Sequence, residues 1–131
     1  MNRILLASLV ATVATACASS PYRQPYAEIR VDTLRSADPN VIPVIINRVD
    51  GETTLDHRYA VVPPGTHKVT VDVPPRKGFH LATQADFTIT TEPCMRYYID
   101  ARLETRVTQE WTPFVRSVEP IGECREKFAA R

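Results

Sequence analysis

Hydrophobic and polar residues alternate along most of the chain, in short segments separated by turn residues. The clearest case is residues 95–107, MRYYIDARLETRV. One face of this segment carries the apolar side chains of Tyr97, Ile99, Ala101 and Leu103. A period of two predicts a β-strand with one buried face, because successive side chains of a strand point to opposite sides. A helix does not fit, since one of its faces would mix Arg102 with these apolar residues.

The same alternation predicts strands at residues 26–32, 66–73 and 85–90. The segment at residues 41–51, VIPVIINRVDG, differs because apolar residues occupy both of its faces. A strand buried on both sides or a strand with a bulge explains that pattern, and Pro43 places the irregularity near the start. A helix is expected only near the C-terminus, around residues 125–130.

Short strands at this spacing predict an all-β domain. Six to eight of them in about 105 residues favour a single antiparallel β-sandwich of the immunoglobulin-like or transthyretin-like kind. The chain has 11 prolines, which suit the turns and sheet edges of such a fold better than a helical bundle. A small closed β-barrel is the alternative architecture.

The chain begins MNRILLASLVATVATACASS. Arg3 is followed by an uncharged run that is shorter than the about 20 apolar residues of a membrane-spanning helix, so we expect residues 1–16 to be a signal peptide. The sequence ATA before Cys17 resembles the lipobox of bacterial lipoproteins, whose cysteine receives a lipid. The alternative is an ordinary signal-peptidase site, which would give a soluble periplasmic or secreted protein.

Lipid on Cys17 would hold the protein at a membrane, since each buried CH₂ contributes about 0.8 kcal/mol. Ala18 stands where inner-membrane lipoproteins carry an aspartate, so the resemblance implies the periplasmic face of the outer membrane. Residues 17–25 are then a short tether rich in small and polar residues. Residues 26–131 form the domain.

The middle of the chain reads VIINRVDGETTLDHRYAVVPPGTHKVTVDV. These about 30 residues resemble the PEGA-like modules of bacterial envelope proteins, in which a strand ending in V-D-G precedes an apolar strand, a Pro-Pro-Gly turn and H-x-V-x-V. Pro64 fixes φ at the first corner of such a turn, and Gly65 accepts the positive φ of the second. The resemblance implies a PEGA-like β-sandwich used for interaction or support, without catalysis. Residues 92–124 are similar to the end of small proteobacterial lipoproteins, which adds no function.

Charge excludes one class of partner. Without Arg3 the chain has 15 basic and 15 acidic residues, whereas a nucleic-acid partner demands a basic face. The composition gives no sign of steering toward anionic lipid or acidic substrates. No cofactor is expected, because only four glycines are present and they form no phosphate-binding loop.

The cysteines predict a covalent link. With Cys17 assigned to lipid, Cys94 and Cys124 remain, and an even remainder in an oxidising compartment indicates a disulfide. It would close a loop of about 30 residues and stabilise the fold by roughly 3.5 kcal/mol. The alternative is a reactive Cys94, which needs a neighbouring base.

The histidines and serines indicate no catalytic or metal site. His57, His67 and His80 lack the spacing of two metal ligands on one strand or helix face. We expect His67 to flank the Pro-Gly turn and the other two to lie on loops. No serine lies in a G-x-S-x-G elbow. The chain is therefore not expected to be an enzyme.

The outward face of residues 95–107 is the candidate partner-binding face. Together with a nearby tryptophan it consists of Arg96, Tyr98, Arg102, Arg106 and Trp111. Arg, Tyr and Trp dominate binding hot spots in protein interfaces. The competing interpretation is a solvated strand face with cross-strand ion pairs, with Trp111 in the core.

Together these features predict an envelope lipoprotein that serves as a periplasmic interaction or structural module, bound to the membrane by its lipid and to an envelope protein by its domain. One alternative is a binder of peptidoglycan or glycan fragments that stacks sugars on Tyr98 and Trp111. Another is a periplasmic inhibitor of an envelope-active enzyme, which would present a loop.

Overall fold

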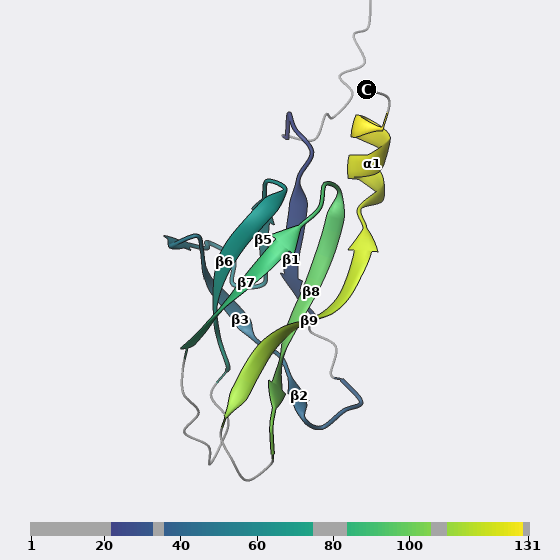
Figure 1. The fold of residues 1–131 in the computed structure, drawn as a ribbon. Helices are drawn as coiled ribbons and strands as arrows, with labels where there is room; N and C mark the ends of the chain where they lie inside the picture. Colours follow the sequence, from purple (N-terminus) through teal and green to yellow (C-terminus); the bar gives the residue numbers. More distant parts are fainter. Residues whose placement is uncertain (1–21, 33–35, 75–83, 106–109, 130–131) are drawn as a thin grey trace, which may run out of the picture.

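The computed structural model describes residues 22–32, 36–74, 84–105 and 110–129. Cys17, His80 and Arg106 lie outside them. The described chain forms two packed β-sheets and a short terminal helix (Figure 1). Its elements are β1 (Ala27–Val31), β2 (Val41–Ile42), β3 (Ile45–Val49), β4 (Glu52–Thr53), β5 (Tyr59–Val62), β6 (Gly65–Asp72), β7 (Gln84–Thr91), β8 (Met95–Leu103), β9 (Trp111–Pro120) and α1 (Gly122–Phe128).

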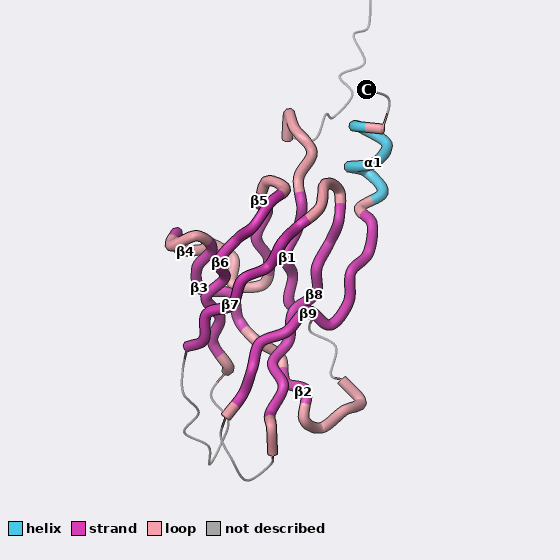
Figure 2. The backbone as a smooth tube through the Cα atoms, viewed as in Figure 1, coloured by secondary structure: helices cyan, strands magenta, loops and turns pink. Residues whose placement is uncertain are grey.

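The larger sheet is built around β8. This strand pairs with β9 along one edge and with β1 and β2 along the other. β1 runs parallel to β8, with Ile29 opposite Tyr97, and β5 pairs antiparallel with β1. The smaller sheet has the order β4-β3-β6-β7. Strands make up most of the described chain (Figure 2), which confirms the predicted β-sandwich. The prediction of purely antiparallel sheets is wrong for the larger sheet, because its β1–β8 pair is parallel, and this sheet is curled like half a barrel.

The core lies between the two sheets and follows the alternation of the sequence. β6 contributes Val69 and Val71, and β8 contributes Ile99 and Ala101, all of them fully buried. Burying one such aliphatic side chain contributes about 1.5–3 kcal/mol. The inward faces predicted for these strands are therefore confirmed.

The predicted strand at residues 41–51 is two strands in different sheets. β2 pairs with β8 in the larger sheet, and β3 pairs with β6 in the smaller one. The chain crosses between the sheets after Pro43, whose missing N–H could not join a ladder. The β3–β6 register also shifts between Ile46 and Arg48, so a bulge is present as well. Apolar residues occupy both faces of this segment because the chain changes sheets within it.

The C-terminal helix starts three residues earlier than predicted, at Gly122, and lies beyond the end of β9, at one end of the larger sheet (Figure 1). A second apolar cluster forms there from Tyr26, Cys94, Ile121 and Cys124, with Val61 and Phe128 against it. Cys94 and Cys124 form a disulfide, as predicted, with their Cα atoms 5.2 Å apart. None of the described residues forms a helix long and apolar enough to cross a bilayer.

Candidate functional site

The predicted partner-binding face of β8 holds a network of ion pairs. Arg96 donates from Nε to Glu28 at 2.7 Å and from Nη1 to Glu119 at 2.8 Å, and the Tyr98 hydroxyl donates to the same Glu119 oxygen at 2.9 Å. Glu28 is only 8% exposed and also accepts from Arg30 at 2.8 Å. β1, β8 and β9 lie side by side, so side chains from three strands provide one another's hydrogen-bond and ion-pair partners here.

The charges of this network are matched. The guanidinium of Arg96 and the hydroxyl of Tyr98 lower the pKa of the Glu119 carboxyl. The Glu28 carboxylate raises the pKa of Arg96 above its ordinary value. Burial, followed by the nearby Glu119, raises the pKa of Tyr98. These side chains therefore bind one another across neighbouring strands, and such cross-strand pairs stabilise a sheet.

A second pair of charges depends on a bulge in β9. The β8–β9 register shifts between Tyr98 and Ile99, which leaves Arg116 as the extra residue. Arg116 bonds Asp32 at 2.6 Å and Asp100 at 3.1 Å, and its guanidinium lies 5.9 Å from the centre of the Tyr98 ring. Asp100 is 3% exposed, and its burial raises the pKa of its carboxyl while Arg116 opposes that rise.

The other residues of the predicted face do not lie together. The side chain of Arg102 is 56% exposed, 3.4 Å from Asp38 and over the ring of Phe114. Trp111 pairs with Leu103 and packs against the core, so it lies on the opposite side of the sheet from Arg102. Trp111 therefore packs against the core, as the competing interpretation expected. It does not form one surface with Tyr98. Arg106 is outside the described residues.

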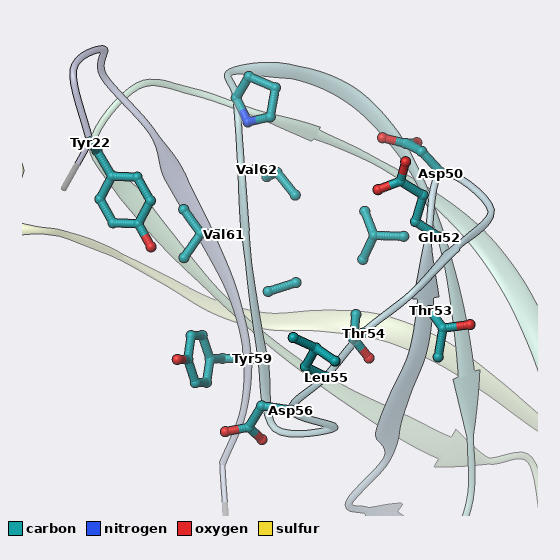
Figure 3. Close-up of a pocket in the computed structure, with 13 residues that line it drawn as sticks. Tyr22, Asp50, Glu52, Thr53, Thr54, Leu55, Asp56, Tyr59, Val61 and Val62 are labelled. Carbon is teal, nitrogen blue, oxygen red and sulfur yellow. The ribbon is translucent and has the colours of Figure 1, made fainter.

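A groove at another edge was not predicted. It has a volume of about 530 Å³ and lies between β5, at the edge of the larger sheet, and the β3–β4 hairpin with the loop after it. Figure 3 shows Tyr22, Val61 and Tyr59 on one side of β5, with Asp50, Glu52 and Thr53 on the other. The groove floor reaches the sandwich core, since Val49 and Val62 line the groove and belong to the core cluster.

The groove has an apolar wall and an acidic wall. Leu55 is fully exposed and Tyr59 is 43% exposed, although both are large and apolar. The carboxylates of Asp50, Glu52 and Asp56 line the groove, and no lysine or arginine of the described ranges does. A second hollow of about 380 Å³ adjoins it and shares Tyr22, Val61, Val62 and Pro63.

His67 joins the two turns at the end of the groove. Its Nε2 donates to the Pro63 carbonyl at 2.6 Å, and its Nδ1 lies 2.6 Å from Oδ2 of Asp50. Asp50 also accepts the Lys68 backbone N–H at 2.9 Å, and these two bonds lower the pKa of its carboxyl. Asp50 and Gly51 both have positive φ, as a tight hairpin turn requires. His67 therefore flanks the Pro-Gly turn, as predicted, and is buried there; His57 lies on a loop.

The sequence did carry a sign of this groove. Leu55 and Tyr59 are apolar residues in a stretch otherwise rich in polar residues, GETTLDHRY, where a loop was expected. What could not be read from the sequence is that β5 ends the larger sheet, because that depends on pairing with β1 about 30 residues away.

Within the described ranges, no three His, Cys, Asp or Glu side chains come together as metal ligands would. Comparison of the chain with protein-family models, curated proteins and solved structures finds no match. The proposal for its function therefore rests on the residues themselves.

Proposed function

We propose that this protein is a lipoprotein of the bacterial envelope whose β-sandwich is an interaction module, held at the outer membrane by lipid on Cys17. The signal-like N-terminus and the lipobox-like residues before Cys17 support the anchor. The balance of 15 basic and 15 acidic residues after residue 16 supports a protein partner in preference to nucleic acid.

The groove along β5 is the observation that carries this proposal. A strand edge beside an apolar groove is a place where a partner segment adds to a sheet, with backbone hydrogen bonds providing affinity and the groove walls providing specificity. The Arg96 network, in contrast, already satisfies its own charges. The partner site therefore lies on β5 and the β3–β4 hairpin, with the Arg96 face supporting the sheet.

The anchor would place this groove near the membrane. Tyr22 lines the groove and is five residues after Cys17. Five extended residues span at most about 18 Å. A partner in the groove would therefore lie within reach of the membrane surface.

In-cell photocrosslinking tests the proposal. A photoreactive residue at Leu55, which is fully exposed, should yield adducts with one or a few defined envelope proteins. The control places the same residue at Glu126, an exposed position on α1. Identical adducts from both positions, or no protein adduct from Leu55, would show that the groove is not the partner site.

A further inference from the structure

One edge of β5 has no backbone hydrogen-bond partner among the described residues. Val31 N–H donates to the Arg58 carbonyl at 2.8 Å, and hydrogen-bonded pairs alternate along an antiparallel ladder. With Ile29 opposite Ala60, the backbone groups of Tyr59 and Val61 therefore point away from β1. No described residue bonds to the Tyr59 or Val61 backbone, so two N–H and two C=O groups face the groove.

This edge also lacks two of the features by which proteins protect sheet edges. Proline and bulges are two such features, because they remove or misdirect ladder hydrogen bonds. β9, which is another edge of the same sheet, has both features: two prolines, Pro113 and Pro120, and the bulge at Arg116. β9 also lies against β7. β5 reads YAVV, which contains neither proline nor charge.

The two walls specify what an added strand must carry. Side chains of a strand point alternately to opposite faces of its sheet. On a strand added to β5, one set would meet the apolar wall of Tyr22, Val61 and Tyr59. The other set would meet Asp50, Glu52 and Thr53, while Leu55 and Asp56 lie at the end of the groove near Tyr59 (Figure 3).

We propose that the groove binds an extended segment of a partner protein in which apolar residues alternate with lysine or arginine, added as a strand to the free edge of β5. The proposal rests on the interaction function and names the kind of partner that the site accepts. β5 has four residues, so the segment recognised is about four to six residues long. A basic side chain is selected because Glu52 and Asp56 line the groove, beside Asp50 with its bonds to His67 and Lys68, and no described lysine or arginine lines it.

Peptide binding to the full-length protein, measured by fluorescence anisotropy, tests this proposal. The probe is a labelled peptide of about eight residues in which valine and lysine alternate. A peptide of valine and glutamate tests the charge. A valine–lysine peptide with N-methyl groups on every second residue tests the backbone, because methylation blocks the hydrogen bonds of one edge. We expect the first peptide to bind and the other two to bind at least about tenfold more weakly.

Two protein variants locate the binding site. Glu52→Lys/Asp56→Lys reverses two exposed charges of the groove and should weaken the valine–lysine peptide at least about fivefold. Glu123→Lys/Glu126→Lys makes the same change on exposed residues of α1 and should leave binding unchanged. Loss in the first variant and retention in the second would support the site, while equal effects would overturn it.

The outcome also separates this inference from the proposed function. If Leu55 crosslinks to a defined protein but all three peptides bind equally or not at all, the interaction module stands and the alternating basic strand is wrong. If soluble peptidoglycan fragments bind in the groove and displace the peptide, or bind where the peptide does not, the site recognises sugar and the inference fails.

Discussion

His67 and Asp50 form a contact that links two turns with both β4 and β5 between them along the chain: Nδ1 of His67 and Oδ2 of Asp50 lie 2.6 Å apart, and Nε2 of His67 bonds the Pro63 carbonyl. The β3–β4 turn and the β5–β6 turn thereby hold a fixed spacing at one end of the groove. His67 is 6% exposed, so an apolar replacement would remove two buried hydrogen bonds, those to Asp50 and to the Pro63 carbonyl.

We therefore expect His67→Phe, which roughly keeps the side-chain volume, to lower the free energy of unfolding by about 1.5–3 kcal/mol in urea. The pKa of Asp50 lies below its ordinary value in the folded protein, so the contribution of its ionised form is present above the ordinary pKa and is lost as pH falls through the folded pKa. In His67→Phe the pKa of the Asp50 carboxyl, followed by NMR, should rise toward its ordinary value. Asp86, whose pKa is lowered by Thr70 and Lys68, is the internal control and should not move.

The disulfide should contribute much of the stability. Cys94→Ser/Cys124→Ser opens a crosslink between residues 30 positions apart, and we expect a loss of about 3–4 kcal/mol in urea unfolding. Reduction of the unmodified protein should give a similar loss, and the reductant should have no effect on the variant. A variant as stable as the parent would contradict the assigned role of this crosslink.

Arg116 should matter because it compensates the buried Asp100. Arg116→Met leaves that carboxyl without its cation, and we expect a loss of about 2 kcal/mol at neutral pH. Burial already raises the pKa of Asp100, so the loss should shrink as the pH is lowered through that pKa and the carboxyl becomes neutral. Arg116→Met/Asp100→Asn should lack this pH dependence. Arg58→Met, at an exposed loop position, should change stability little.

Arg102→Glu separates the two surfaces. The Arg102 side chain is 56% exposed and 3.4 Å from Asp38, so its reversal should cost at most about 1 kcal/mol. If the partner binds at β5, crosslinking from Leu55 should persist in this variant and weaken in Glu52→Lys/Asp56→Lys. Crosslinking that is lost in Arg102→Glu and persists in Glu52→Lys/Asp56→Lys would show that the partner binds at the β8 face predicted from the sequence.

The anchor is tested at Cys17. Cys17→Ala should abolish incorporation of labelled palmitate and move the protein from the membrane fraction to the soluble fraction or to an unprocessed precursor. Continued labelling of the variant would show that the lipid is attached elsewhere or that the interpretation of the N-terminus is wrong.

Local alternation was sufficient to predict β1, β6, β7 and β8, which supply much of the core. The inward residues of β6 and β8 follow strictly at every second position, and each is at least partly buried. β9 was not predicted, because the bulge at Arg116 places Val115 and Val118 on one face at a spacing of three and so hides the period of two. A bulge is set by the partner strand, which a local pattern does not reveal.

The site was predicted less well than the fold, for a related reason. The alternation correctly placed Arg96 and Tyr98 on the outer face of β8, but their partners Glu28 and Glu119 come from β1 and β9. Pairing over these distances decides whether an arginine is free for a partner or already bound. The free edge of β5 is likewise a property of strand order, which only the assembled sheet shows.

The position of β1 has a mechanical consequence. The residues proposed as a tether come shortly before β1 in the sequence, and β1 lies between β5 and β8. A pull on the membrane anchor would run along this strand and load both of its ladders in shear, so that many hydrogen bonds must break together instead of one after another. A load between the membrane and a partner held on β5 would cross the β1–β5 ladder, and the remainder of the sandwich would bear little of it.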